Sequence, residues 1–360
     1  MRLLKRASAL LFLVVLAVST DQYLFCPRYA FPPTSPFRGD SIYNPYRDYQ
    51  AGEWTLANFH AHARSWAGIT NGRGGPEDIH AVYDSLGYGI HSISNYMEVS
   101  PYGSDRPGYV RAYEHGYNIP KGHQLVLGDG SVVWRDYILP RTLSNKQRIL
   151  DLLAANPDNA VIVNHPAMRT GHDPGDMRHL TNYDALEVLN SPRPTFDYWD
   201  TALSHGRMVS IVGNDDTHHA EDPSTVGRHA TYVHAPGRTE REVIRAIKEG
   251  RTMGVLFPER LRADFALKRR VIRKASPALG EMVVDGDVLR VRFLEPVYKF
   301  SIIGQGGVRI MEADSTLSVD FAISRAHTYL RLSYATADGI QWFLNPVFRF
   351  QGRLGNRRAP

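Results

Sequence analysis

Apolar residues follow two different patterns along the chain, and the change between them falls near residue 260. From residue 53 to residue 258, short apolar runs typical of strands alternate with segments that have the spacing of amphipathic helices. The strand-like runs lie at 54–60, 88–94, 109–114, 123–127, 160–164, 185–189, 208–212 and 229–234, and the helix-like segments at 76–86, 144–155, 195–205 and 239–249. Strands that alternate with helices over this length predict an α/β barrel or a doubly wound sheet.

The second pattern covers residues 259–360, where apolar and polar positions alternate with a period of two. The runs lie at 288–294, 298–303, 308–312, 317–323, 329–334 and 341–350, with Gly, Asp and Ser between them. No helical pattern interrupts these runs, so we predict a small antiparallel β-sandwich that packs beside the first domain.

The N-terminus has the layout of an export signal, which we place at residues 1–19. Arg2, Lys5 and Arg6 precede an apolar run at 9–18, and small residues stand before a cleavage point near Ser19. The run is short for a membrane span, so cleavage is favoured, with an uncleaved N-terminal tether as the alternative. A periplasmic or extracellular protein is therefore expected.

Residues 20–52 are rich in Pro, Tyr and Arg, which predicts an extended linker without chemistry of its own. The single cysteine, Cys26, excludes a disulfide within the chain. Loss of the three basic residues of the signal lowers the formal net charge from +5 to +2. That charge is too small to indicate a nucleic-acid partner.

Polar residues of the kinds that bind metals occur next to several predicted strands. They are His60, His62, Glu114, His123, His165, Asp216 and His218. In α/β barrels the carboxyl ends of the strands share one face, so side chains from separate strands converge there. Each residue alone has a plainer interpretation: Glu114 could pair with Arg111, and the aspartates near residue 216 could belong to a turn. The series as a whole favours a metal site.

The order of these motifs resembles the PHP (polymerase and histidinol phosphatase) family of metallohydrolases. The resemblance rests on His-x-His at 60–62, Glu114, His123, Asn164-His165-Pro166 and the run Gly213-Asn214-Asp215-Asp216-Thr217-His218. It covers residues 53–220 and implies a distorted (β/α)7 TIM-like barrel at 53–258. The β domain at 259–360 is similar to the arrangement in some exported PHP-like hydrolases.

The resemblance also implies a set of metal ligands. One ion would take His60, His62, Glu114 and Asp216, and a second would share Glu114 and add His123 and His165. His218 matches the last histidine of the family, which elsewhere helps to hold a third ion. The chain departs from the family at Asn95-Tyr96, where the family has Asp-His, and at Gly68, where three-metal members have another ligand. His91 could substitute, although a histidine in a strand is more often part of the core. We therefore expect one or two divalent ions, of Zn, Mn or Fe.

These expectations make the protein a hydrolase that uses a hydroxide bound to one or two divalent metals, with Asp216 or His218 moving the proton. A small anionic phosphoester is the favoured substrate, because Arg64, Arg73 and the glycines at 72–75 precede a helix start, and Asn95 is expected to contact the substrate. Glu77 and Asp78 would compete with an anion there. Two alternatives stay open: an amide or carbamate hydrolase on the same site, and a non-catalytic binding or scaffold protein on a degenerate barrel.

Overall fold

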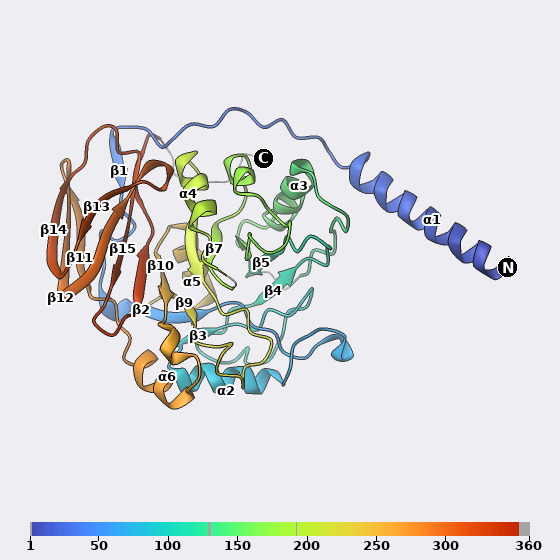
Figure 1. Cartoon of the computed structure of the whole chain (residues 1–360), viewed down its shortest axis with the longest axis horizontal. Helices are drawn as coiled ribbons and strands as arrows, with labels where there is room; N and C mark the ends of the chain where they lie inside the picture. The colour runs from blue at the N-terminus through green and yellow to red at the C-terminus, as the bar shows by residue number, and fades with distance from the viewer. Residues whose placement is uncertain (1, 129–130, 192, 353–360) are drawn as a thin grey trace.

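The computed structural model describes residues 2–128, 131–191 and 193–352, and it has the mixed α/β fold that the sequence predicts (Figure 1). The α-helices are α1 (Arg2–Tyr23), α2 (Pro76–Leu86), α3 (Leu143–Leu153), α4 (Phe196–Ser204), α5 (Glu240–Lys248) and α6 (Phe265–Ile272). The first strands are β1 (Ser41–Tyr43), β2 (Trp54–Asn58), β3 (Ile90–His91), β4 (Ala112–His115), β5 (Gln124–Leu127), β6 (Ala160–Val163), β7 (Ala185–Leu189), β8 (Ser210–Gly213), β9 (His229–His234) and β10 (Thr252–Leu256). The later strands are β11 (Leu279–Asp285), β12 (Val288–Ile303), β13 (Arg309–Ala313), β14 (Thr316–Ala322), β15 (Tyr329–Ala335), β16 (Gln341–Leu344) and β17 (Val347–Phe350).

Local capping explains where the predicted helices begin. At α5, Thr239 Oγ1 accepts a hydrogen bond from Glu242 N (3.3 Å), and the Glu242 carboxylate accepts one from Thr239 N (3.0 Å). This reciprocal capping box satisfies two backbone donors that a helix start leaves free. At α2, proline occupies the first helical position, where its missing N–H is harmless. All four helices predicted between residues 53 and 258 are confirmed within two residues at each end.

Strands β4 to β8 form a five-stranded sheet in chain order. Strands β6, β7 and β8 are parallel, whereas β5 runs antiparallel to both β4 and β6. The amino end of β5 therefore lies beside the carboxyl ends of its two neighbours. This reversal determines where His123, which precedes β5, is placed.

The other strands belong to one larger mixed sheet that runs through both predicted domains. Its continuous order is β1-β17-β15-β16-β10-β9-β2-β3, with β11 to β14 attached through β12. Strand β10 pairs with β16, from Met253–Leu344 to Leu256–Gln341, across the predicted boundary at 258–259. The predicted division into domains is thus spanned by a hydrogen-bonded ladder.

The ladders among the described residues do not close into one barrel. Between β3 and β4 there is an isolated parallel bridge, from Tyr96 to Glu114. Between β8 and β9 a side chain takes the place of a ladder, because Thr231 Oγ1 donates to Gly213 O (2.9 Å) and accepts from Gly213 N (3.0 Å). The two sheets meet at these two narrow seams, and Thr252 Oγ1 of β10 also donates to Ile211 O of β8 (2.7 Å).

The C-terminal strands confirm the antiparallel pattern but differ from the prediction in three places. Helix α6 lies before the predicted runs, in the part of residues 259–360 for which no element was predicted, and its start is capped by Asp264, whose Oδ1 accepts from Ala266 N (2.7 Å). The runs at 288–294 and 298–303 form one strand, β12, with irregular pairing where the two runs meet. The run at 341–350 divides into β16 and β17 at Asn345-Pro346, because proline cannot donate to a ladder.

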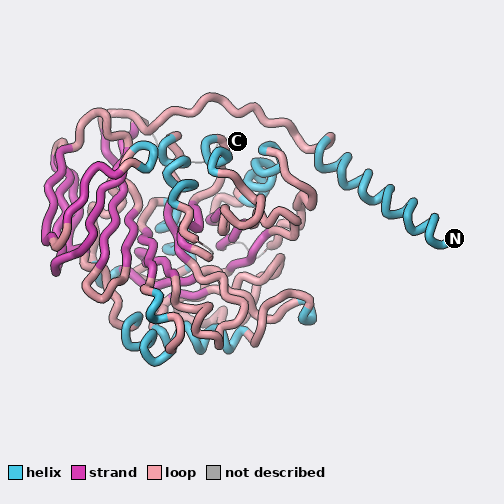
Figure 2. Tube along the Cα trace, viewed as in Figure 1, coloured by secondary structure: helices cyan, strands magenta, loops and turns pink. Residues whose placement is uncertain are grey.

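At the N-terminus, α1 extends away from the body (Figure 1). Its apolar side chains from Leu10 to Leu16 are exposed. None of the helices formed by the described residues has the length and apolarity to span a membrane. The base of α1 is held by Gln22, whose Nε2 donates to Leu139 O (2.9 Å). The expected linker then crosses the surface as loop (Figure 2) and adds strand β1, which pairs with β17.

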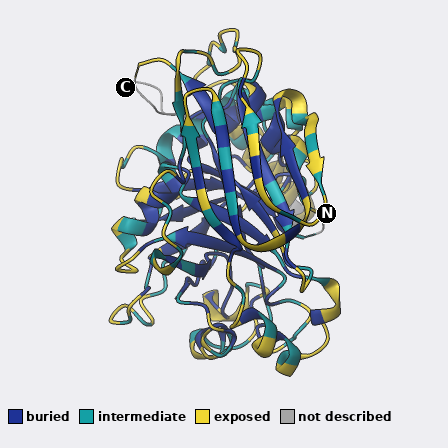
Figure 3. Cartoon of the chain, turned by 90° about the vertical axis from the view of Figure 1, so that its left-hand side faces the viewer, coloured by how far each residue is buried: buried dark blue, intermediate teal, exposed yellow. Residues whose placement is uncertain are grey.

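In the largest apolar cluster, Trp54 and Leu56 of β2 are packed together with residues of the C-terminal strands, such as Val291 of β12 and Leu332 of β15. Figure 3 shows buried residues concentrated where the C-terminal strands meet the rest of the chain. The cluster also contains Ala61, so it packs against the segment that carries His60 and His62.

Candidate metal centre

The predicted ligands converge because of the directions of their strands. His60 and His62 follow β2, Glu114 lies in β4, and His165 follows β6. Since β5 is antiparallel to its neighbours, His123 at its amino end lies on the same side as these residues. Asp216 and His218 follow β8. The structure brings these seven side chains together in overlapping groups: His60–His165–Asp216, His60–His62–Glu114, His62–Asp216–His218 and Glu114–His123–His165.

Backbone hydrogen bonds hold the His-x-His segment against the segment that carries Asp216. Asp216 N donates to His60 O (3.0 Å), and His62 N donates to Thr217 O (2.8 Å). Asp216 has a φ of 52°, in the left-handed region that aspartate tolerates better than most residues. Neighbouring Asp215 fixes this turn, accepting hydrogen bonds from Gly227 N (2.6 Å) and Tyr83 Oη (2.9 Å). The relative position of the two segments is therefore set by the main chain.

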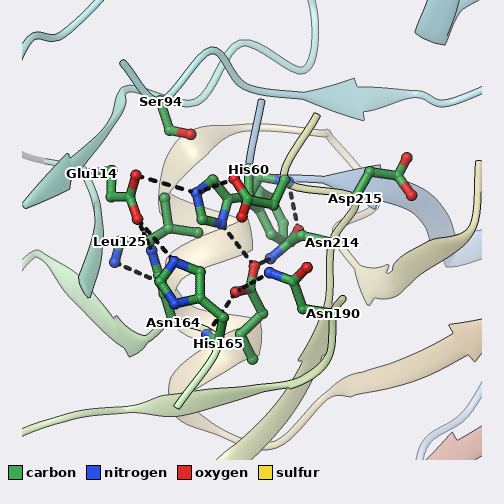
Figure 4. Close-up of polar contacts among 12 residues, drawn as sticks. His60, Ser94, Glu114, Leu125, Asn164, His165, Asn190, Asn214 and Asp215 are labelled. Carbon is green, nitrogen blue, oxygen red and sulfur yellow. Dashed lines mark hydrogen bonds and ion pairs between the residues drawn. The ribbon is translucent and has the colours of Figure 1, made fainter. Parts of the chain in front are cut away.

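Glu114 stands between two groups of imidazoles, and each of its oxygens faces one group. Figure 4 shows Glu114 with one member of each group, His60 and His165. Its Oε2 lies 3.2 Å from His62 Nε2 and 3.6 Å from His60 Nε2. Its Oε1 lies 2.8 Å from His123 Nδ1 and 3.1 Å from His165 Nε2. Asp216 Oδ1 completes the first group, at 3.1 Å from His60 Nε2. This is the arrangement expected of a carboxylate that is shared by two cations.

Several of these atoms are buried without a hydrogen-bond partner among the described residues. They are His60 Nε2, His62 Nε2, Glu114 Oε2 and Asp216 Oδ1, all from the first group. Buried polar atoms without partners are rare, because each carries a desolvation penalty. Their common direction and their mix of imidazole and carboxylate fit a divalent cation that accepts nitrogen and oxygen ligands. The residues present therefore fit the metal that the sequence predicts.

Glu187 is a part of the site that the sequence interpretation missed. Its Oε1 accepts from His60 Nδ1 (2.9 Å) and Asn214 Nδ2 (2.9 Å), and its Oε2 accepts from His165 N (2.9 Å) and Asn190 Nδ2 (2.7 Å). A proton held on His60 Nδ1 leaves Nε2 free to bind a metal, as such outer carboxylates do in metalloproteins. The signal was present in the sequence: Glu187 is the only charged residue of the apolar strand Ala185–Leu189.

The electrostatics of the cluster reflect its concentration of carboxylates and imidazoles. Burial opposes ionisation of Glu114, but His123 and His60 outweigh it and hold the pKa of this carboxyl well below its usual value. Burial likewise opposes protonation of His60, but Asp216, Glu187 and Glu114 raise the pKa of the imidazole well above its usual value. The site thus favours positive charge at His60. A bound cation would supply that charge in place of the proton.

The open side of the cluster is formed by Tyr96 and His218. The His218 ring lies 4.3 Å from the His62 ring, and the Tyr96 ring lies 4.5 Å from it, both near parallel. Burial and the neighbouring His62 lower the pKa of His218 to about 4. His218 Nε2 is buried and has no hydrogen-bond partner among the described residues, although the side chain as a whole is partly exposed.

The residues predicted to contact substrate lie in different surroundings. Arg64 and Arg73 are exposed on the loop beside the cluster, and Arg73 N donates to His218 O (2.7 Å). Asn95 is buried, and its Oδ1 accepts from Ala63 N (3.0 Å), so its amide oxygen supports the His-x-His segment. The expected anion site at the start of α2 is occupied by Asp78, whose carboxylate accepts from Gly75 N (2.7 Å).

His91 lies outside every group of potential ligands among the described residues. Its Nε2 is 2.5 Å from His80 Nδ1, and its ring stacks on Tyr83, on the outer side of β3 beside α2. His91 therefore does not replace the histidine that the family has at the position of Tyr96. The group of potential ligands that contains His218 has only two other members, His62 and Asp216.

No family model and no curated protein matches this chain. Two solved structures are similar to it at low sequence identity. One is a two-domain protein from Bacteroides vulgatus containing a predicted PHP-like metal-dependent phosphoesterase; it is 12% identical, with a TM-score of 0.42, over 88% of this chain and 99% of that chain. The other is PsfC from Pseudomonas syringae, which is 14% identical, with a TM-score of 0.39, over 61% of this chain and 98% of that chain. Both similarities are weak, so the function proposed below rests on the side chains of this chain.

Proposed function

We propose that this protein is a metal-dependent hydrolase of the PHP type, and that its substrates are phosphoesters. One observation carries the proposal: the two oxygens of Glu114 face two separate groups of imidazoles within 3.6 Å. A carboxylate in that position can hold two divalent cations close together, as in hydrolases that act on phosphate esters. The amide or carbamate alternative would use the same residues, and no contact in the site favours it.

Two cations bound there would lower the pKa of a water molecule and neutralise charge that develops on a phosphoryl oxygen. His60, His62, Glu114 and Asp216 would hold one cation, and Glu114, His123 and His165 the other. Glu187 keeps the proton of His60 on Nδ1 and so orients its ring. His218, which is partly exposed and neutral near pH 7, would accept or return a proton on the substrate side.

The proposal extends to the finer fold and to location. Strands β2 to β9, with their two seams, are a distorted form of the TIM-like barrel. Helix α1, with its basic start and exposed apolar residues, is the export signal, which makes the mature protein periplasmic or extracellular.

Metal stoichiometry in matched variants tests the proposal. The purified protein should bind two Zn or Mn ions per chain. His123→Ala should reduce the content to one ion, and Glu114→Gln should reduce it further because both groups lose their shared ligand. His172→Gln, which changes a buried histidine outside the cluster, should leave the stoichiometry at two.

Activity toward p-nitrophenyl phosphate mono- and diesters should fall with metal content across the same variants. Full activity in Glu114→Gln would contradict the metal mechanism. Turnover of amides or carbamates without turnover of any ester would replace the phosphoester assignment. Bound metal without any turnover would support the scaffold alternative.

A further inference from the structure

Outside α1 and the C-terminal strands, the exposed large apolar side chains of the described residues lie in a few loops. In the described residues from 27 to 293 they are Trp66, Ile69, Tyr102, Tyr117, Ile119, Trp134 and Ile138. Apolar side chains that gather on an otherwise polar surface mark a binding site more often than chance placement. Their position relative to the metal centre shows what they could bind.

A series of contacts connects two of these residues to the metal centre. The Tyr96 ring lies against His62, and Tyr96 O accepts a hydrogen bond from Trp66 Nε1 (2.7 Å). Trp134 meets Trp66 edge to face, with ring centroids 5.9 Å apart and an angle of 83°. The two indole rings therefore form a corner beside the open side of the metal cluster. Tyr96 lies between Trp66 and the predicted ligand His62.

The backbone at Trp66 has an unfavourable conformation although the side chain is exposed. Its φ of 51° and that of Ala67 (52°) lie in the left-handed region, which is unfavourable for residues with a Cβ. Even so, 45% of Trp66 is exposed. Strained backbone that fixes an exposed side chain is characteristic of ligand-binding sites.

Positive charge lies beside the same corner. Lys121 Nζ is 5.4 Å from the centre of the Tyr96 ring, and Arg64 and Arg73 are exposed on the loop that flanks Trp66. A ligand with an anionic group at the metals and a flat apolar group on the indoles would match this distribution of charge and apolar surface.

We propose that Trp66 and Trp134 form a platform for a flat aromatic group carried by the phosphoester substrate. This inference rests on the proposed function and adds the substrate class: aryl or heteroaryl phosphoesters in preference to small alkyl ones. The indoles favour a ring over a lipid surface as the occupant, because a hydrogen bond and an edge-to-face contact fix their orientation.

Binding of non-hydrolysable phosphonates to the metal-loaded full chain tests the platform without turnover. 1-Naphthylphosphonate should bind at least ~10-fold more tightly than methylphosphonate, since stacking on an aromatic ring contributes about that much. Trp66→Ala and Trp134→Ala should each remove most of this preference, because they weaken binding of 1-naphthylphosphonate far more than binding of methylphosphonate. Trp66→Phe should retain it.

Two further variants separate stacking from folding effects. Trp66→Gly relieves the left-handed strain, so its melting temperature should equal or exceed that of the parent chain while the preference for naphthyl disappears. Leu294→Ala removes an exposed apolar side chain of the C-terminal domain and should leave the preference intact.

Equal binding of both phosphonates would overturn the platform and leave the phosphoesterase proposal standing. Binding of neither would overturn both proposals. Binding to phosphatidylglycerol vesicles that depends on Trp66 and Trp134, without a preference for naphthyl, would reassign the patch to membrane docking.

Discussion

Glu187 shows how one buried carboxylate can control a metal site that it does not enter. It accepts four hydrogen bonds, from His60 Nδ1, His165 N, Asn190 Nδ2 and Asn214 Nδ2. All four groups are donors, so an ionised carboxylate suits the position and any group with an N–H does not. The same residue therefore orients His60 and fixes the backbone of His165.

Glu187→Gln should lower metal affinity by roughly 10–100-fold, the range found when outer partners of ligating histidines are changed. The NH2 group of the glutamine replaces one carboxylate oxygen and faces the two N–H donors that this oxygen accepted from. The side chain therefore loses its hold on either His60 Nδ1 or His165 N. Competition with a chromogenic chelator measures the affinity. Asn190→Ala removes one donor that does not touch His60, and it should change affinity far less. Equal loss in both variants would mean that general destabilisation is responsible.

Another buried residue, His172, makes stability depend on pH. Burial, reinforced by Lys146 and Arg141, lowers the pKa of His172 to about 4 despite the nearby Asp176. The unfolded chain takes up the proton near pH 6.5, so this contribution to stability is complete above pH 6.5 and is lost as the pH falls toward 4. At pH 5 the loss amounts to about 2 kcal/mol.

His172→Gln removes that titration. Between pH 7 and pH 5 the free energy of unfolding of the variant should fall by about 2 kcal/mol less than that of the parent chain. Urea unfolding at the two pH values measures the difference. The metal centre is the same in both proteins, so its own acid sensitivity cancels. If the free energy of unfolding falls equally in the two proteins, protonation of His172 does not destabilise the folded chain.

At the scale of elements, the sequence was informative where local chemistry determines the structure. The starts of α2 and α5 follow from Pro76 and from the Thr239–Glu242 capping box, and both were predictable. The convergence of His60, Glu114 and Asp216 was also expected, because polar residues at strand ends point to one face of an α/β sheet.

The rest depends on tertiary contacts that no local pattern records. Strand β10 was missed because Gly254 interrupts its apolar run; the fold packs the Ile211 side chain against this glycine, where a Cβ would lie 2.7 Å from Ile211 Cδ1. The eight residues of α6 are too few for a clear period, although Asp264 marks its start. Asn95 was read as a contact for substrate, and only the fold shows that its amide supports Ala63 N.

At the scale of the whole molecule, the two predicted domains share a sheet and a core. The β10–β16 ladder carries backbone hydrogen bonds from one to the other, and the main apolar cluster contains residues from both. Helix α4 adds a polar connection to β15: Asp200 accepts hydrogen bonds from Arg331 Nε and Nη2, both at 2.7 Å. The Arg331 guanidinium also lies over the Phe196 and Trp199 rings. The chain is therefore expected to unfold in a single transition.

Asp200→Ala tests this connection, because it leaves the buried guanidinium of Arg331 without its partner. Loss of one member of a buried ion pair typically lowers the free energy of unfolding by about 3–5 kcal/mol, whereas replacing both members by apolar residues is close to neutral. The double variant Asp200→Ala/Arg331→Met should therefore recover most of the loss in urea unfolding. The exposed pair of Asp40 with Arg325 supplies the control, and Asp40→Ala should leave the midpoint unchanged. If Asp200→Ala instead splits the curve into two transitions, the ion pair rather than the shared sheet couples the two parts of the chain.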